Sequence, residues 1–152
     1  MTKLTDREEF IVEFALKQAE LSKCRDKKTA AILVSEDLTQ IYSIGINGGP
    51  RGGLDCLCRD EQDDKKKYTC VHAEINCLVK NRVVDDEPKI MVCTKQPCAM
   101  CASAMINANA NIKQVWYVEE YWDDTGLNIL DDAGIEALQL VEVDDDIEIH
   151  QV

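Results

Sequence analysis

The chain has 152 residues, the length of one ordinary domain, which is enough to bury a core without disulfide bonds. Hydrophobic residues make up 45% and charged residues 30%, and no apolar run is long enough to span a bilayer, so we expect one globular domain over residues 1–152 and no membrane partner. A formal net charge of −12 argues against a polynucleotide partner, because affinity for a phosphate backbone depends on clustered lysines and arginines.

The amino-terminal stretch MTKLTDREEF is charged and leads directly into a helical pattern. It does not have the form of a secretory signal, and we therefore expect a cytoplasmic protein. In that reducing compartment, eight cysteines indicate metal ligands or buried thiols rather than disulfide bonds.

The first half of the chain begins with a helix and continues with a pair of strands. TDRE at residues 5–8 has the form of a capping box, and apolar residues at helical spacing predict a helix over about residues 6–22. Two β-rich runs at residues 29–35 and 40–47 predict an antiparallel pair. GGPRGG then breaks the chain, and residues 51–69 are predicted to be a polar loop that contains cysteines.

The second half alternates helices with strands. The pattern predicts helices over residues 72–81, 98–108 and 125–133, and strands over residues 89–94, 112–119 and 138–143. Such alternation is typical of parallel strands covered by helices. Together the elements predict an α/β fold, a three-layer α/β/α sandwich around a mixed five-stranded sheet, with residues 144–152 as an acidic C-terminal tail.

The stretch TKQPCAMCASAMI places Cys98 and Cys101 three positions apart in the first turn of a helix, so both sulfurs project to one side. Exposed backbone N–H groups at a helix start favour thiolates, the form of cysteine that binds metal. By itself this spacing fits zinc ligands, a redox pair or two thiols without a special role.

His72 is one of only two histidines in the chain and stands where a helix is predicted to start. A lone histidine there is more often a packing or capping residue than a ligand. Combined with Cys98 and Cys101, however, it gives three zinc ligands and leaves the fourth tetrahedral position for water, as in catalytic zinc sites. Glu74 stands where a carboxylate can take a proton from that water without binding the metal.

The sequences HAE at residues 72–74 and PCAMC at residues 97–101 together match H-x-E followed by P-C-x-x-C. On these residues the chain resembles the zinc-dependent cytidine deaminase superfamily. Within it, five stretches resemble the deoxycytidylate deaminases in order over about residues 20–143: SKCRDKKTAAILV, GINGGPRGG, VHAEINCLV, INANANIKQVWYVEEYWDD and DDAGIEALQL.

The resemblance implies a cytidine deaminase-like fold and the hydrolysis of dCMP to dUMP with release of ammonia. It implies that Glu74 deprotonates the water and returns protons to the ring nitrogen and the departing amine. It also implies that Asn47 touches the sugar, that Ala73 lies against the pyrimidine edge, and that Tyr121 belongs to the substrate site.

The resemblance implies an effector site in the loop that follows residue 44. Gly45, Asn47, Gly48 and Arg51 are the expected contacts for dCTP or dTTP, and Mg²⁺ is expected only if such a triphosphate binds. Ile46 stands where the family has Tyr, which leaves open whether this chain retains the regulation.

Phosphate binding departs from the family as well. Residues 119–124, EEYWDD, are acidic where some relatives carry Arg beside the substrate phosphate. A phosphate among carboxylates needs a compensating cation, so Arg25 or Lys27 is the expected partner. The alternative for both residues is an exposed charged turn.

Four of the remaining cysteines suggest a second metal site. Some phage deoxycytidylate deaminases hold a structural zinc with cysteines at positions that Cys24 and Cys56 match. Cys58 and Cys70 would complete a Cys₄ site of ordinary chemistry, and scattered free thiols are the alternative.

Other prominent residues have simpler interpretations. Cys77 and Cys93 lie on apolar faces and are predicted to be buried in the core. Trp122 fits a lid over the base, a subunit contact or a packing aromatic, and His150 is expected to be exposed.

Several alternatives remain beside a dCMP deaminase. The substrate could be cytidine, dCTP or a base in RNA, although net acidity argues against RNA. A non-catalytic zinc-stabilised binding module is disfavoured by Glu74, because a structural site needs no carboxylate there. A redox protein built on Cys98 and Cys101 would be excluded by tight zinc retention. Family members are usually oligomers, so a homo-oligomer, hexamer or dimer, is expected.

Overall fold

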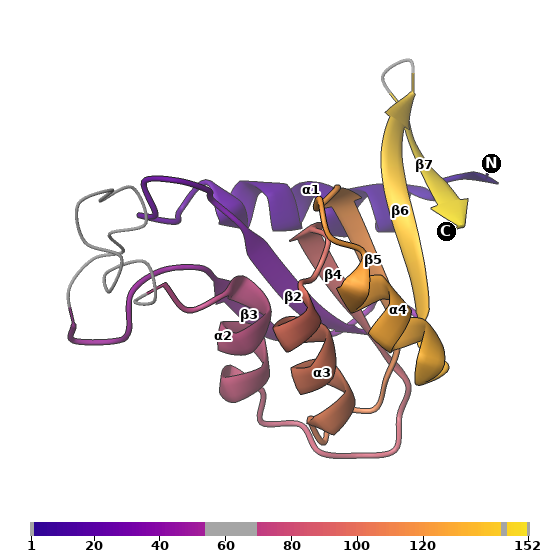
Figure 1. The fold of residues 1–152 in the computed structure, drawn as a ribbon. Helices are drawn as coiled ribbons and strands as arrows, with labels where there is room; N and C mark the ends of the chain where they lie inside the picture. The colour runs from indigo at the N-terminus through magenta and orange to yellow at the C-terminus, as the bar shows by residue number, and fades with distance from the viewer. Residues whose placement is uncertain (1, 54–69, 144–145, 152) are drawn as a thin grey trace.

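A mixed sheet separates two helical layers in the computed structural model, which describes residues 2–53, 70–143 and 146–151 (Figure 1). The strands are β1 (Thr2–Lys3), β2 (Ala30–Ser35), β3 (Ile41–Ile46), β4 (Lys89–Lys95), β5 (Ile112–Glu119), β6 (Glu136–Val143) and β7 (Asp146–Gln151). The helices are α1 (Asp6–Ala19), α2 (Ala73–Lys80), α3 (Ala99–Asn107) and α4 (Thr125–Asp132). Every helix and strand predicted from the sequence is present.

The strand order is β1-β7-β6-β5-β4-β2-β3. Strand β4 pairs in parallel with β5, and β5 with β6, whereas β2 pairs antiparallel with both β3 and β4. The predicted mixed five-stranded sheet, β2 to β6, is therefore confirmed as part of a larger one, which β7 and β1 extend beyond β6.

The carboxyl-terminal stretch differs from the prediction. Residues Asp146–Gln151, expected to belong to an acidic tail, form β7, which pairs antiparallel with β6 and with β1 and so extends the sheet. The sequence DIEIHQ alternates apolar and polar residues at the period of a strand. The many acidic residues in and around this stretch instead suggested a solvated tail.

Helix α1 begins with the predicted capping box. The backbone N–H of Thr5 donates to the Glu8 carboxylate at 2.7 Å, and the backbone N–H of Glu8 donates to Thr5 Oγ1 at 3.3 Å. The helix ends three residues before the predicted end, because the N–H groups of Leu21 and Ser22 bond to carbonyls three residues back, which tightens the last turn.

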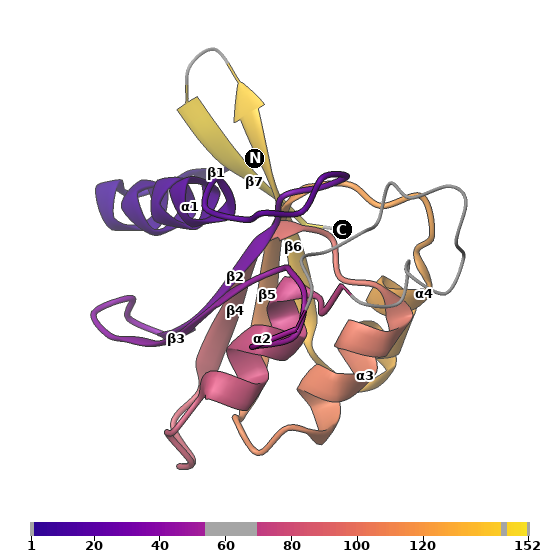
Figure 2. The same ribbon diagram turned by 90° about the vertical axis from the view of Figure 1, so that its left-hand side faces the viewer.

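Each face of the sheet has its own hydrophobic cluster. Figure 2 shows α1 alone on one side and α2, α3 and α4 on the other. On the α1 side, Ile11 and Val12 pack in one cluster with Ile32 of β2; on the other side, Leu33 packs with Cys77 of α2. Side chains alternate between the faces of a strand, and the first five residues of β2, 30–34, are all apolar and buried, so this strand contributes to both cores. Cys77 and Cys93 are fully buried, as predicted.

No helix in the described ranges is both long enough and apolar enough to cross a membrane.

Lys89, the first residue of β4, has a completely buried side chain. Its ammonium lies 2.6 Å from Asp85 Oδ1 and 2.9 Å from the Glu87 carbonyl oxygen. A buried charge is costly without such partners. The hydrogen bond from Lys89 holds the pKa of the Asp85 carboxyl below its ordinary value of 3.8.

This ion pair predicts a pH-dependent stability. A carboxyl whose pKa is lower in the folded protein stabilises it above the unfolded pKa, and loses that contribution as the pH falls through the folded pKa. Asp85→Asn should therefore lower the free energy of unfolding at neutral pH, with a smaller effect near about pH 3. Urea unfolding of both proteins at the two pH values measures this, and an effect that does not depend on pH would contradict it.

Candidate active site

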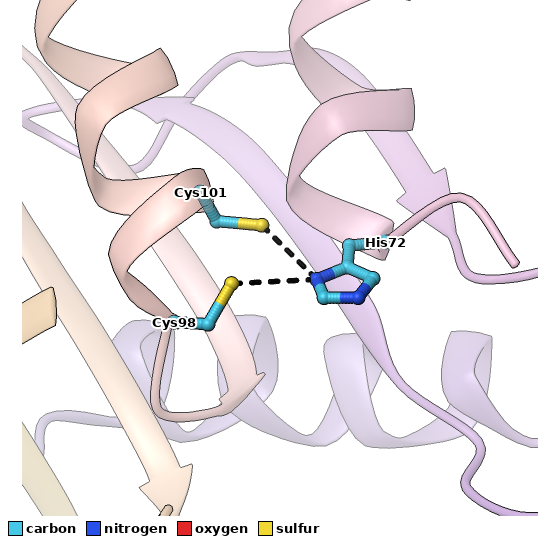
Figure 3. Close-up of side chains that lie close together, drawn as sticks. All are labelled: His72, Cys98 and Cys101. Atoms are coloured by element: carbon cyan, nitrogen blue, oxygen red, sulfur yellow. Dashed lines mark hydrogen bonds between the residues drawn. The ribbon is translucent and has the colours of Figure 1, made fainter. Parts of the chain in front are cut away.

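His72, Cys98 and Cys101 come together at the amino-terminal ends of two neighbouring helices (Figure 3). His72 is the N-cap residue of α2, Cys98 is the N-cap residue of α3, and Cys101 lies in the first turn of α3. Both N-cap residues have extended backbone angles, and neither side chain makes a capping hydrogen bond. Their ligand atoms therefore point toward each other instead of back at their own helices.

The three side chains have the spacing of a metal site. Nδ1 of His72 lies 3.5 Å from Cys98 Sγ and 3.3 Å from Cys101 Sγ, and all three ligand atoms lie within 4.8 Å of one another. Zinc bonds of about 2.0–2.3 Å at tetrahedral angles separate ligand atoms by roughly 3.3–3.8 Å. In the part of the chain that the structure describes, no other His, Cys, Asp and Glu side chains form such a group.

The charges at this group favour metal binding. Hydrogen bonds, first from Cys101 and then from His72, lower the pKa of the Cys98 thiol to about 3. The pKa of Cys101 is raised, chiefly because its thiol donates to the Cys98 sulfur. One thiolate is thus present at neutral pH, and the donor set suits zinc, which binds thiolate sulfur and neutral imidazole.

Glu74 lies in the first turn of α2, two residues after His72, and only 6% of it is exposed. Burial raises the pKa of this carboxyl above its ordinary value, because the charged form is less stable where water cannot solvate it. The residue nevertheless lines the same cavity as His72 and Cys98.

That cavity has a volume of about 410 Å³, which suits a ligand of nucleotide size. His72, Cys98 and Glu74 line part of it, and Asn47, Lys27, Lys95 and Tyr121 line other parts. Cys101 is fully buried and is not among the lining residues. The walls of the cavity thus carry a carboxylate, an amide and two ammonium groups.

Comparison with known proteins identifies the arrangement. Residues 5–119 match the family model described as the cytidine and deoxycytidylate deaminase zinc-binding region. The chain belongs to this family. The match extends over α1 and both sequence motifs, so it includes His72, Glu74, Cys98 and Cys101.

The relatives of this deaminase include proteins named for one substrate. The deoxycytidylate deaminase of Homo sapiens is 28% identical over 123 residues, covering 77% of this chain and 67% of the human protein. A probable deoxycytidylate deaminase of Caenorhabditis elegans is 30% identical over 101 residues, covering 64% of this chain and half of its own length. The crystal structure of the dCMP deaminase from cyanophage S-TIM5, in complex with dCMP and dUMP, has a TM-score of 0.77 at 27% identity and covers 91% of this chain and 99% of that one. The cytidine deaminase-like fold expected from the motifs is thereby confirmed.

Asn47 lies at the cavity wall, but its amide is already engaged. Its Oδ1 accepts hydrogen bonds from Ser22 Oγ at 2.7 Å and from the backbone N–H of Thr29 at 2.8 Å. Its Nδ2 donates to the Lys27 carbonyl oxygen at 2.6 Å. Asn47 therefore positions the segment that carries Lys27. The sequence predicted only its contacts with the sugar or an effector and not this structural role.

The other predicted substrate residues fall in different places. Ala73 is fully buried, between two residues that line the cavity, His72 and Glu74. Lys27 and Tyr121 line the cavity, whereas Arg25 is exposed and is not among the lining residues. The geometry thus favours Lys27 over Arg25 as a contact for the substrate.

Trp122 also lines the cavity, although 86% of the residue is exposed. A packing role, one of the three interpretations of this side chain, does not fit that exposure. A lid over the base and a subunit contact both remain compatible with it.

Two of the four cysteines predicted for a second zinc site are described. Cys24 is buried and Cys70 is half-buried, and both line the active-site cavity. Cys56 and Cys58 lie outside the described residues.

The predicted effector residues separate into two environments. Gly45 is buried in β3, and Asn47 is buried just beyond it, whereas Gly48 pairs with Val71 in an isolated bridge and Arg51 is exposed. Gly45 lies against the start of α2: an added Cβ would overlap the carbonyl oxygen of Ala73 and the backbone nitrogen of Cys77. This glycine thus allows the helix that carries His72 to approach β3 closely.

Gly45→Ala should therefore destabilise the protein and disturb the metal site. Because the overlapping atoms belong to the backbone, α2 and β3 must separate, and such overpacking typically costs about 1–3 kcal/mol or more. Thermal unfolding and zinc content measure the two effects. Gly48→Ala is the control for stability, since a Cβ there meets nothing within 4 Å. Equal stability of the two variants would contradict the prediction.

Proposed function

We propose that this deaminase hydrolyses dCMP to dUMP and ammonia, with His72, Cys98 and Cys101 holding a zinc ion. The observation that carries the proposal is the His-Cys-Cys group, two members of which line one nucleotide-sized cavity together with the buried carboxylate of Glu74. The phage enzyme solved with dCMP and dUMP supports the choice of substrate, since it is similar over nearly the whole of both chains.

His72, Cys98 and Cys101 would hold the zinc ion, which would supply a Lewis acid that lowers the pKa of the attacking water. Glu74 accepts the proton of the attacking water and passes protons to the ring nitrogen and to the departing amino group. Burial suits this carboxylate to the task, because it keeps bulk water away from the proton it carries while the cavity leaves it accessible to the substrate.

The rest of the cavity orients the substrate. Tyr121 and Asn47 lie along its walls. Ala73, the first residue of α2, is fully buried, and its contact with the pyrimidine edge stays a prediction. Lys27, which lines the cavity, supplies positive charge toward the phosphate in preference to Arg25.

The test is ultraviolet-monitored deamination of dCMP, cytidine and dCTP, with zinc content measured on the same samples. We expect loss of dCMP absorbance at a kcat/KM well above that for the other two. Turnover of only cytidine or dCTP would overturn the substrate assignment. Bound zinc without turnover of any of them would favour the zinc-stabilised binding module, and absence of zinc would favour a redox role for Cys98 and Cys101.

Other features stay predictions. A second, structural zinc on Cys24, Cys56, Cys58 and Cys70 would raise the zinc content to about two per chain. A homo-oligomer would appear in the solution mass, and regulation by dCTP or dTTP, with Mg²⁺, as a change of KM. The expected cytoplasmic location also awaits a direct test.

A further inference from the structure

Two lysines meet at the active-site cavity, and the sequence pointed to only one of them. Lys95 is the last residue of β4, three positions before Cys98, and its side chain is 15% exposed. Lys27 comes from the segment before β2, and its side chain is 51% exposed. Both line the cavity that contains His72 and Glu74.

The two ammonium groups share one carboxylate oxygen. Glu119 Oε1 lies 3.0 Å from Lys27 Nζ and 4.0 Å from Lys95 Nζ. Lys27 is therefore hydrogen-bonded to Glu119, whereas Lys95 is too far from it for a hydrogen bond. The ammonium of Lys95 also lies 5.4 Å from the centre of the Tyr121 ring, which is at the cavity wall.

Lys95 is thus a mostly buried cation without a close carboxylate contact in the described ranges. Burial lowers its pKa, and the neighbouring ammonium of Lys27 lowers it further. A buried ammonium is stabilised by an anion at hydrogen-bonding distance, and the open side of this one is the substrate cavity.

The backbone around Lys95 is fixed by its neighbour. Gln96 is buried, and its N–H donates to the Glu119 carbonyl oxygen at 2.8 Å. Its side chain donates to Asp124 Oδ1 at 3.0 Å and accepts from the backbone N–H of Tyr121 at 3.2 Å. These hydrogen bonds of Gln96 hold the end of β4, which carries Lys95 and leads to Cys98, beside the end of β5, which carries Glu119 and leads to Tyr121.

We infer that Lys95 is the specificity-determining residue for the 5′-phosphate, so that its ammonium makes the enzyme select a nucleotide over the corresponding nucleoside. The inference rests on the proposed function and names the group that recognises its substrate. Because Glu119 is 4.0 Å from the Lys95 ammonium, a phosphate can be the hydrogen-bonding partner that this ammonium lacks. Glu119 meanwhile holds Lys27 beside Lys95 through its 3.0 Å contact. A charge-assisted hydrogen bond between ammonium and phosphate is among the stronger contacts a protein can make.

The test compares dCMP with deoxycytidine, and dUMP with deoxyuridine, in the wild type, Lys95→Met and Lys95→Arg. Methionine keeps most of the length of the side chain and removes its charged end. We expect Lys95→Met to lower kcat/KM for dCMP and affinity for dUMP by about 10- to 100-fold, the range for a hydrogen bond to a charged group. Deoxycytidine turnover and deoxyuridine affinity should change little, and Lys95→Arg should recover part of the loss.

The control is Lys17→Met, which removes an exposed lysine that is paired with Glu20 on α1. Equal losses for nucleotide and nucleoside in Lys95→Met would indicate a structural role and overturn the inference. So would a wild type that binds dUMP no more tightly than deoxyuridine, whatever its activity. If the wild type does not deaminate dCMP but binds dUMP tightly, and Lys95→Met weakens that binding, the proposed reaction is overturned and the phosphate contact is kept.

Discussion

Glu74→Gln is expected to lower kcat for dCMP by about 10²- to 10⁴-fold, the usual contribution of a positioned acid-base group. Glutamine has nearly the same shape as glutamate, so the buried site, in which residue 74 is 6% exposed, should keep its packing. The amide cannot accept the proton of the attacking water. Ultraviolet-monitored turnover of dCMP, with zinc content measured in parallel, separates lost chemistry from lost metal.

Glu20→Gln is a suitable control for this variant, because the Glu20 side chain is 68% exposed and lies beyond the end of α1. It should retain wild-type turnover. Glu74→Gln that still deaminates dCMP at a rate close to the wild type would remove Glu74 from the mechanism. Zinc loss in Glu74→Gln would show instead that the carboxylate supports the metal site.

Cys101→Ser is expected to reduce the zinc content by one equivalent per chain and to abolish activity. The residue is fully buried, and its sulfur lies 3.3 Å from His72 Nδ1 in the three-ligand group. Removing a ligand should weaken binding by more than the roughly 10- to 100-fold that follows loss of a group that only orients a ligand. Because metal bound to the folded state stabilises it, Tm should fall as well.

Cys93→Ala separates the metal effect from simple loss of packing. Cys93 is also fully buried, but it lies in β4 outside the three-ligand group. This variant should unfold at a lower temperature because a cavity replaces the thiol, and it should keep its zinc. Full zinc occupancy in Cys101→Ser, measured at limiting metal concentration, would contradict the assignment of Cys101 as a ligand.

The clustering of His72, Cys98 and Cys101 could be predicted because it depends on local patterns. HAE and PCAMC each start a helix with a clear apolar period, and both helices follow the rule that alternating strands and helices pack in layers. The spacing within each motif then determines where the ligand atoms lie on a helix end. The local patterns do not show that the two helix ends lie close together. That was expected from the resemblance to the family.

The features that the sequence did not reveal depend on distant contacts. Lys95 follows an apolar strand and carries no pattern of its own; its importance comes from Glu119 and Tyr121, which lie on the other side of α3 in sequence. The predicted strand over residues 40–47 contains Gly45, but the close approach of α2 to this residue cannot be deduced from a glycine between two isoleucines. Strand β7 was missed because its alternation stands among acidic residues.

The three candidate ligands belong to one short stretch of chain, with His72 and Cys101 only 29 positions apart. A metal ion that joins them closes a small loop, and small loops lose little entropy on closure. Strand β4, which lies inside that loop, is central in the sheet, whereas β5, α4 and β6 are all made later. During synthesis, the growing chain thus contains all three candidate ligands before β5, β6 and β7 have been made. Zinc captured at that stage would pin α2 and α3 around β4 and provide the later strands with an edge on which to assemble.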